Sequence, residues 1–275
     1  MKKVICIADW AKDSYTNQEF QTAFEGFAKN PNDVRVTFVS STPSTIHTGY
    51  ILNQMVYTEE RLGRPTETII FQNTDPRIQT EGVVQSAEGA QFLIAHLASN
   101  IYVCGPNAGF DFSFIKPQIE ELFIYPGIEK GTQFRSRDLF SRVIAHLADY
   151  MEQELELEEI HPSVIAALDH ETFYIGHIDN YGNIKTTITV DDLKGIHEHD
   201  EIVKVTIGSV TKDARYVDNM FGSYPGELVI YPGSSGRVEN PYLEVTVRRN
   251  FDKGELRTGM HEFQNPKPGD IIKIA

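Results

Sequence analysis

The hydrophobic pattern of this 275-residue chain changes near residue 155. Before that point, β-rich apolar runs at 3–8, 34–40 and 67–72 alternate with segments that carry apolar residues at helical spacing. After residue 171, strand-like runs follow one another, separated by Gly, Pro, Asp and Asn turns. The alternating part predicts a sheet covered by helices, and the later part predicts a small β-barrel or sandwich.

A hairpin pattern in the sequence predicts that the first sheet is mixed rather than purely parallel. The apolar runs 91–97 and 101–104 flank Ser99-Asn100, a pair suited to a tight turn between antiparallel strands. An amphipathic helix over 137–152 then closes this domain. The predicted fold class is an α/β N-terminal domain with a mixed sheet plus a small all-β, barrel-like C-terminal domain. The predicted bounds are 1–155 for the α/β domain, 156–171 for an acidic linker and 172–275 for the β-barrel domain.

Charge and composition exclude several classes of function. The chain has 39 acidic and 25 basic side chains, and its formal net charge of −14 repels nucleic-acid phosphates and anionic membranes. The apolar run Val4–Ala8 is short and stops at Asp9, so it predicts a strand rather than a signal peptide. Cys6 and Cys104 lie in apolar runs and make no disulfide framework. We expect a cytoplasmic protein with a small-molecule substrate, no nucleic-acid partner and no membrane association.

The run His197-Glu198-His199-Asp200 is the obvious candidate for a metal site. Adjacent residues of an extended loop point in opposite directions, so at most two of these side chains can share one ion. A solvated turn is the better interpretation. Because the chain also lacks the Cys-x-x-Cys, His-Glu-x-x-His, Walker and Gly-x-Ser-x-Gly motifs, we expect no metal and no cofactor.

Polar side chains follow the predicted strands of the first domain. Asp9 ends the first strand, Asp75 lies just past the third, and Ser136 precedes the last helix. The carboxyl ends of strands in α/β sheets hold the ligand crevice, so these side chains are candidates for one shared site. Taken singly, each is better explained as a helix cap or a turn former. If the three side chains lie close together in the folded chain, a shared functional site is the better interpretation.

Two turns of the second domain also carry functional residue types. Gly176–Asn183 joins two strand-like runs, and a hairpin explains its Asn180 and Gly182 but does not require Tyr181 or Asn183. Gly233-Ser234-Ser235-Gly236 lets backbone amides approach a ligand, although a flexible turn explains the same residues. Both turns remain candidates for ligand contacts.

Five short motifs of the chain stand in a specific order and at specific spacing, although each motif alone is weak. In chain order the motifs are Asp9-Trp10-Ala11-Lys12-Asp13-Ser14-Tyr15, Asn73-Thr74-Asp75-Pro76, Gly105-Pro106-Asn107-Ala108-Gly109, Phe134-Arg135-Ser136-Arg137-Asp138-Leu139-Phe140 and Ile178-Asp179-Asn180-Tyr181-Gly182-Asn183. Together they resemble the S-adenosylmethionine hydroxide adenosyltransferase, chlorinase and fluorinase family, and the resemblance spans nearly the whole chain.

The resemblance implies an α/β domain that binds the adenosyl group and a homotrimer with its sites at subunit interfaces. In the family, water, chloride or fluoride attacks the ribose 5′ carbon of S-adenosylmethionine and displaces methionine. Because the positive sulfur makes methionine a good leaving group, the protein mainly strips and positions the attacking species. The resemblance therefore implies S-adenosylmethionine as a substrate and no added cofactor.

Site residues follow from the same resemblance. Asp9 matches the acid that grips the ribose hydroxyls, and Asp75 matches the acid that handles water. Asp13 and Asp179 match acids near the methionine amino group. Asn183 matches the amide that reads adenine, and Ser234 or Ser235 falls near a serine that holds the methionine carboxylate. The predicted substrate-binding residues are Asp9, Asp13, Asn107, Asp179, Tyr181, Asn183, Ser234 and Ser235, and the predicted catalytic residues are Asp75, Arg135 and Ser136.

The nucleophile pocket departs from the family pattern. An arginine is expected a short distance after Asp75, but Thr80-Glu81-Gly82 occupies that stretch and Arg77 comes too early. Arg135-Ser136 stands where water-using members have His-Gly, and serine there is the halogenase-like choice. The aromatic residue expected near Ser44 to cover the ribose is also missing. Three interpretations stay open: an enzyme that uses water or a halide, a binding module that has lost the chemistry, and a trimeric scaffold without a ligand.

Overall fold

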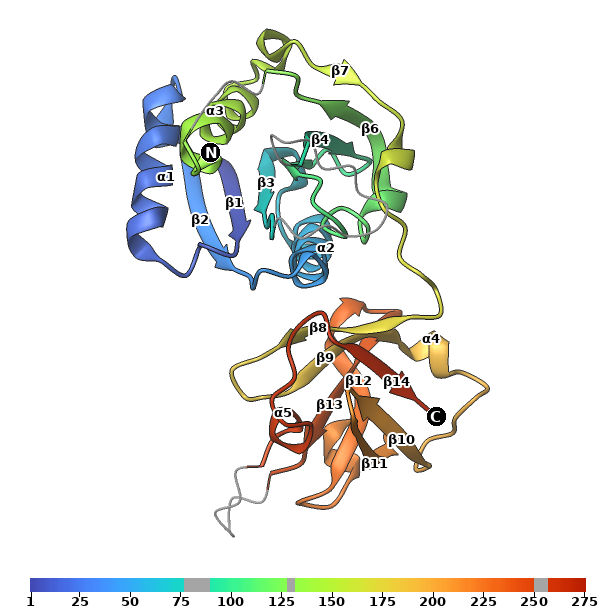
Figure 1. Cartoon of the computed structure of the whole chain (residues 1–275). Helices are drawn as coiled ribbons and strands as arrows, with labels where there is room; N and C mark the ends of the chain where they lie inside the picture. Colours follow the sequence, from blue (N-terminus) through green and yellow to red (C-terminus); the bar gives the residue numbers. More distant parts are fainter. Residues whose placement is uncertain (77–89, 128–131, 250–256) are drawn as a thin grey trace. The chain divides into compact units, whose positions relative to one another are not determined.

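The computed structural model describes residues 1–76, 90–127, 132–249 and 257–275 (Figure 1). The chain divides into two compact units, Met1–Leu168 and Asp169–Ala275. No helix in these described ranges combines the length and apolar character needed to cross a bilayer.

The first unit contains a mixed sheet, as predicted, with the strand order β2-β1-β3-β5-β4-β6-β7. Strands β1, β2, β3 and β5 run parallel to one another, and β4 runs antiparallel to β5 and β6. The turn between β4 and β5 contains Asn100 at a positive φ of 66°, which asparagine tolerates. The strands are β1 (Lys2–Ala8), β2 (Val34–Ser40), β3 (Thr68–Asn73), β4 (Phe92–Leu97), β5 (Tyr102–Pro106), β6 (Ile119–Ile124) and β7 (Glu158–Glu159).

Helices cover both faces of this sheet, which explains why its central strands are continuous apolar runs. Val4 and Cys6 of β1 pack with α1 (Ser14–Phe27) and α3 (Ser141–Ala148) on one face. Ile5 and Ile7 pack with α2 (Thr45–Leu62) on the other, because side chains alternate along a strand (Figure 1). The first face contains several phenylalanine rings, including Phe20 stacked on Phe71 with ring centroids 5.5 Å apart.

The last helix of the first unit is shorter than the predicted span 137–152. It begins with a π-helical turn, η4 (Ser136–Phe140), and α3 then ends at Ala148. Tyr150 adopts a left-handed φ of 58°, which stops the helix before the periodic pattern ends. Single helical turns in the chain are Pro31–Asp33, Pro65–Glu67, Lys116–Gln118, Glu152–Leu155, Pro162–Val164 and Met220–Gly222.

The first unit extends further along the chain than the boundary predicted at residue 155. Glu158 and Glu159 form β7 and pair with Ile124 and Phe123 of β6. Ile165 is 1% exposed and packs into the same apolar cluster as α2. The predicted linker thus contributes backbone pairing and one core residue to the first unit. The sequence did not predict this, because a strand of two residues within an acidic stretch has no recognisable apolar pattern.

The second unit is a closed β-barrel with the strand order β10-β11-β12-β13-β9-β8-β14, which confirms the predicted barrel. Its interior is filled by aliphatic side chains such as Ile184, Ile230 and Val245. The strands are β8 (Phe173–Ile178), β9 (Ile184–Thr189), β10 (Ile202–Ile207), β11 (Val210–Tyr216), β12 (Leu228–Arg237), β13 (Asn240–Val247) and β14 (Ile271–Ile274), with short helices α4 (Val190–Leu193) and α5 (Gly259–Glu262).

Candidate functional site

A polar pocket of about 140 Å³ lies at the carboxyl ends of β1 and β3 in the first unit. Its lining includes four predicted site residues, Asp9, Asp75, Arg135 and Ser136, together with Asn73. The structure therefore brings together side chains that come from the first strand, the third strand and the turn before the last helix. Parallel strands deliver their carboxyl ends to one edge of the sheet, which is why residues so distant in sequence meet here.

Asp9 is one of two half-buried acids in the described lining of this pocket, the other being Asp75. Its backbone N–H donates to the Asn73 carbonyl at 3.4 Å, which continues the pairing of β1 with β3 one step beyond the strands. Burial raises the pKa of the Asp9 carboxyl, and the nearby charge of Asp75 adds to that rise. Hydrogen bonds from the Trp10 and Asp9 backbone amides oppose it. The ionised form of Asp9 is thus disfavoured in this pocket unless a ligand supplies hydrogen-bond donors to its carboxylate.

A cluster of buried hydroxyls fixes the backbone next to Asp75. The Thr74 hydroxyl lies 2.6 Å from the Thr48 hydroxyl and 3.1 Å from that of Ser41, and Thr48 donates to Ser41 at 3.1 Å. These contacts tie the end of β3 to α2 and to the residue after β2. The stretch from Arg77 to Gly82, where the family pattern places an arginine partner of Asp75, lies outside the described residues.

Ser136 is 1% exposed and opens the π-helical turn. The Asn73 side-chain amide donates a hydrogen bond to its hydroxyl oxygen. Because that oxygen accepts from Asn73, the Ser136 proton is directed elsewhere and can be donated to a group in the pocket. Sequence reasoning missed Asn73 as a functional residue, although it stands in the same motif as Asp75.

Two neighbouring arginines have different environments. Arg135 is half-buried and lines the pocket. Arg137 instead pairs with Glu19 and Asp138, each at 2.7 Å, and so links α1 to the turn before α3. Among the described lining residues, Arg135 is therefore the cation that a ligand in this pocket would meet.

Asp13 and Asn107 are absent from the described lining of the pocket. Asp13 caps α1, accepting from the Tyr15 N–H at 3.0 Å and the Thr16 hydroxyl at 2.8 Å. The Asn107 side-chain amide donates to the Val164 carbonyl at 3.1 Å, which ties the loop after β5 to the end of the first unit. The helix-cap explanation thus accounts for the contacts of Asp13.

Asp111 is a fully buried acid that the sequence reasoning missed. It lies in the loop after β5, which packs so closely on α2 that a Cβ at Gly49 would lie 2.6 Å from the Phe110 carbonyl oxygen. Neither Asp111 carboxyl oxygen has a hydrogen-bond partner among the described residues. Burial raises the pKa of Asp111 well above its usual value, the charges of Asp75 and Asp9 add to this, and the nearby amides of Asp111 and Ala108 oppose it. We find no sequence signal that would have identified it.

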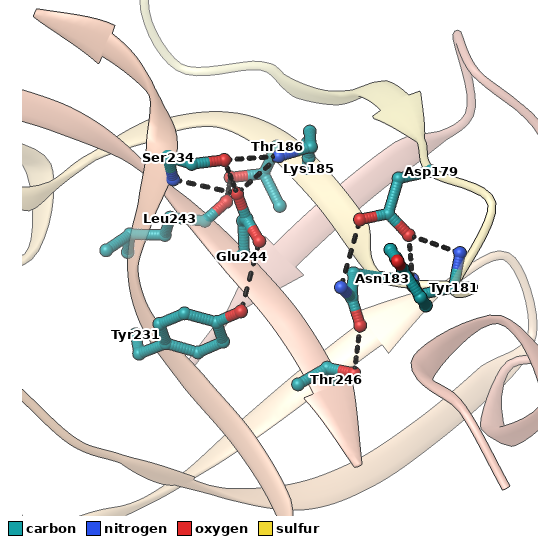
Figure 2. Close-up of polar contacts among 10 residues, drawn as sticks. All are labelled: Asp179, Tyr181, Asn183, Lys185, Thr186, Tyr231, Ser234, Leu243, Glu244 and Thr246. Carbon is teal, nitrogen blue, oxygen red and sulfur yellow. Dashed lines mark hydrogen bonds and ion pairs between the residues drawn. The ribbon is translucent and has the colours of Figure 1, made fainter. Parts of the chain in front are cut away.

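The second unit holds a polar cluster on the turn between β8 and β9 (Figure 2). Asp179 Oδ1 accepts from the backbone N–H groups of Tyr181 at 2.9 Å and Asn183 at 3.0 Å. Its Oδ2 accepts from the Asn183 side-chain amide at 3.0 Å, and Asn183 Oδ1 accepts from the Thr246 hydroxyl at 2.5 Å. The Asn183 side chain is thereby held at both ends, with Thr246 as a partner that the sequence did not reveal.

Tyr181 lies outside this side-chain network. Its side chain is 66% exposed, and the Arg249 guanidinium lies 5.6 Å from the ring centroid. Arg249 also donates to the Tyr181 carbonyl at 2.5 Å. An exposed ring held by a cation offers a flat apolar face for stacking.

A second group of contacts surrounds Ser234 on the irregular part of β12 (Figure 2). Glu244 Oε1 accepts from the Ser234 N–H at 2.8 Å, the Ser234 hydroxyl at 3.0 Å and Lys185 Nζ at 2.6 Å. Glu244 Oε2 accepts from the Tyr231 hydroxyl at 3.0 Å. A Cβ at Gly233 would collide with the Glu244 side chain, so glycine is required for this approach.

Glu244 is 3% exposed although it lies between two core residues, Leu243 and Val245, and so faces the outside of the barrel. Burial by itself would raise the pKa of the Glu244 carboxyl, but the hydrogen bonds from Lys185 and Ser234 outweigh it and hold the pKa below its usual value. Ser235, the alternative to Ser234, is 6% exposed.

The histidine-rich run does not form a compact donor set. His197 Nδ1 lies 3.2 Å from Glu201, whereas His199 Nε2 lies 2.9 Å from Asp218. Over the described ranges, no three His, Cys, Asp or Glu side chains gather as a metal site would require.

These features define a class of protein in which an α/β unit with an acidic pocket is followed by a β-barrel unit with a buried polar cluster. Residues 173–240 match the family model described as the SAM hydroxide adenosyltransferase C-terminal domain. This match supports placing the chain in the SAM hydroxide adenosyltransferase family, as its motifs predicted. The matched range includes Asp179, Asn183 and Ser234 and ends before Glu244.

Solved structures share the fold. An uncharacterized conserved protein from Thermotoga maritima is 18% identical, with a TM-score of 0.71 over 99% of this chain and 100% of that chain. A conserved hypothetical protein from Thermus thermophilus is also 18% identical, with a TM-score of 0.65 over 100% of this chain and 100% of that chain. A comparison with curated proteins gave no match.

Proposed function

We propose that this protein binds S-adenosylmethionine and displaces methionine from its ribose 5′ carbon with water or a halide. The observation that carries the proposal is the pocket in which Asp9, Asp75, Arg135 and Ser136 meet. The family match of the barrel unit supports it. The proposed reaction uses no metal ion or other cofactor, and treatment with a chelator is expected to leave product formation unchanged.

Asp9 is the proposed ribose ligand. An ionised carboxylate can accept hydrogen bonds from two neighbouring hydroxyls at once, and charge-assisted bonds of this kind are strong. Burial raises the pKa of Asp9, so two hydrogen bonds donated by a ribose would compensate the anion for lost water. The ligand would thereby supply the donors that burial takes away from the carboxylate.

The attacking species would meet Asp75, Arg135 and Ser136. Asp75 can orient or deprotonate a water molecule. Arg135 cannot act as a general base because its guanidinium stays protonated, but it can hold an anion. The Ser136 hydroxyl, with its oxygen already accepting from Asn73, can donate to a halide or to water. This combination favours slow hydrolysis through Asp75 or the use of a halide.

A binding module without catalysis is the second candidate. It is favoured by Arg135, which stands where a base would be needed for efficient attack by water. The two candidates differ in one experiment. Purified protein is incubated with S-adenosylmethionine in halide-free, chloride and fluoride buffers, and adenosine, 5′-halogenated adenosine and methionine are resolved. The enzyme releases methionine together with one of these nucleosides. Binding measured by calorimetry without any product supports the module, and absence of both contradicts the whole proposal.

The homotrimer implied by the family resemblance is part of the proposal. Sedimentation equilibrium at micromolar protein is expected to give three times the chain mass of 31.1 kDa. A monomer that still binds S-adenosylmethionine would contradict this part alone.

A further inference from the structure

Trp10 carries a buried hydrogen-bond donor that the described part of the first unit leaves unused. It is the only tryptophan of the sequence, it follows Asp9 just beyond β1, and it belongs to the lining of the polar pocket. Its indole Nε1 is buried, and no described residue accepts a hydrogen bond from it. A buried donor without an acceptor destabilises the folded state, so this N–H indicates an acceptor that arrives with a ligand.

Three phenylalanine rings hold the indole in place. Phe134 lies edge-on to it with ring centroids 5.4 Å apart, Phe20 is tilted at 5.7 Å, and Phe38 is edge-on at 6.3 Å. The rings come from the segment before the π-helical turn, from α1 and from β2. Because side chains from three separate elements pack on the indole, its N–H cannot turn freely toward solvent to find a partner.

The pocket lining places two further donors with this N–H. The Ser136 oxygen already accepts from Asn73, which leaves its hydroxyl to donate, and the Arg135 guanidinium can only donate. A water oxygen has two lone pairs, and three donors would leave neither of them free to attack a carbon atom. A halide ion has more lone pairs, and it needs no base because it loses no proton when it attacks. These donors therefore suit a halide better than water.

Two acids of the same lining, Asp9 and Asp75, oppose the binding of an anion, because like charges repel. The proposed adenosyl substrate offsets this repulsion. Its ribose hydroxyls would donate to Asp9, and its positive sulfonium is attached to the 5′ carbon that the nucleophile attacks. We therefore expect a halide to bind only after a cationic adenosyl ligand occupies the pocket.

We propose that the indole N–H of Trp10 donates a hydrogen bond to the attacking halide and thereby favours a halide over water as the nucleophile. The inference rests on the proposed function and names a residue that determines its second substrate. In this step the halide forms a bond to the 5′ carbon, the carbon–sulfur bond breaks, and its electron pair leaves with methionine. No proton is transferred and no further reactant is needed.

Tryptophan fluorescence tests the contact directly, because emission excited beyond the tyrosine absorption band comes from Trp10 alone. Wild-type protein is saturated with sinefungin, in which a carbon that bears an amino group replaces the sulfonium and cannot leave. Sodium chloride then replaces sodium methanesulfonate at constant ionic strength. We expect a saturable change in emission that requires sinefungin. Collisional quenching of N-acetyltryptophanamide, which is linear in chloride concentration, is the control. A linear change, or the same change without sinefungin, overturns the contact.

Trp10→Phe removes the N–H and keeps an aromatic ring. In assays with S-adenosylmethionine and either chloride or fluoride, we expect the halide KM to rise about 10-fold, the usual effect of losing a hydrogen bond to an ion. Affinity for S-adenosylmethionine, measured by calorimetry, is expected to stay within about 3-fold. Phe38→Leu is the matched control, because it loosens the same group of rings and removes no donor. We expect it to keep the halide KM within about 2-fold.

Other results overturn the inference. If Trp10→Phe leaves the halide KM unchanged, or if Phe38→Leu raises it equally, the indole N–H does not contact the halide. If the wild type forms adenosine alone in every buffer, the inference fails while the proposed function stands with water as the nucleophile. If the wild type neither binds S-adenosylmethionine nor forms a product, both fail. Should Trp10→Phe not fold, the fluorescence titration of the wild type still decides.

Discussion

The side-chain amide of Asn73 donates a hydrogen bond to the hydroxyl of Ser136, joining the end of β3 to the start of the π-helical turn. This contact constrains the Ser136 hydroxyl group. Because its oxygen accepts from the Asn73 amide, its O–H points away from that amide and is available to donate to another group. The Ser136 hydroxyl is therefore positioned to donate to a group bound in the pocket.

Ser136→Ala removes the hydroxyl donor from the pocket in which the nucleophile is proposed to bind. If the hydroxyl stabilises an attacking halide, halide-dependent product formation is expected to fall about 10-fold to 100-fold, the usual effect of losing a bond to an ion. Binding of S-adenosylmethionine is expected to stay within about 3-fold, because in the proposed reaction the serine contacts the nucleophile rather than the adenosyl group. Product analysis and calorimetry measure the two effects. A Ser136→Ala protein with unchanged halide turnover would show that the hydroxyl has no contact with the nucleophile.

Asp9→Ala is expected to weaken the adenosyl ligand about 30-fold or more, since the loss of a charge-assisted pair of bonds costs about 2–4 kcal/mol. Asp33→Ala is the matched control, because Asp33 is exposed and precedes β2 at the opposite edge of the sheet. Calorimetry on both folded variants provides the measurement. Equal affinities for Asp9→Ala and Asp33→Ala would remove Asp9 from the site.

Substitutions of Asp13 distinguish a role as a helix cap from a role as a ligand contact. Asp13→Ala is expected to reduce the free energy of unfolding by about 1 kcal/mol, and Asp13→Ser is expected to restore most of it because serine also caps helices. Urea denaturation measures the stability, and ligand affinity is expected to be the same in both variants. Weaker binding in Asp13→Ser at full stability would instead support the contact with the methionine amino group that the family resemblance implies.

Arg135→His introduces a side chain that can accept a proton near neutral pH. Adenosine formation in halide-free buffer is expected to rise at least about 10-fold if the pocket otherwise positions water. Arg135→Gln, which has no basic group, is the control and is expected to give no such increase. Rapid release of adenosine by the wild type would contradict the argument that this position disfavours attack by water.

Asp111 predicts a pH dependence of stability. Because burial raises its pKa in the folded state, the folded protein holds a proton that the unfolded chain releases above the usual aspartate pKa of 3.8. Stability is therefore expected to fall as pH rises from that value through the raised folded pKa. Asp111→Asn, which cannot titrate, should lose this dependence and be more stable at the upper end of the window. Urea unfolding across the range from about pH 4 to about pH 8 tests this expectation, and equal slopes for both proteins would refute it.

The effect of Glu244 on the pH dependence of stability has the opposite sign to that of Asp111, because hydrogen bonds from Lys185 and Ser234 lower the pKa of Glu244. Its contribution to stability is present above the usual glutamate pKa of 4.5 and is lost as pH falls through the lower folded value. The two acids therefore affect different parts of the pH profile, and single substitutions distinguish them.

Long periodic runs made much of the fold predictable. The strands at 3–8, 34–40 and 67–72 and the hairpin around Ser99-Asn100 were recognisable because apolar spacing and turn chemistry are local properties. The short β7 was not, because a two-residue strand acquires its identity from β6 rather than from its own residues. The end of α3 likewise depended on the conformation of Tyr150, which lies within the predicted helical span.

By itself, the sequence determined the α/β and β-barrel patterns of the two parts, the family motifs and the acids at strand ends. Each of these depends on residues that are close together in the chain or on a fixed order along it. Tertiary structure alone decided which side chains meet. Lys185 and Glu244 are 59 residues apart and pair through strand register, and Asp111 becomes a buried acid through the packing of its loop on α2. Contacts of this kind depend on three-dimensional proximity and burial, and these properties are absent from local patterns of residues.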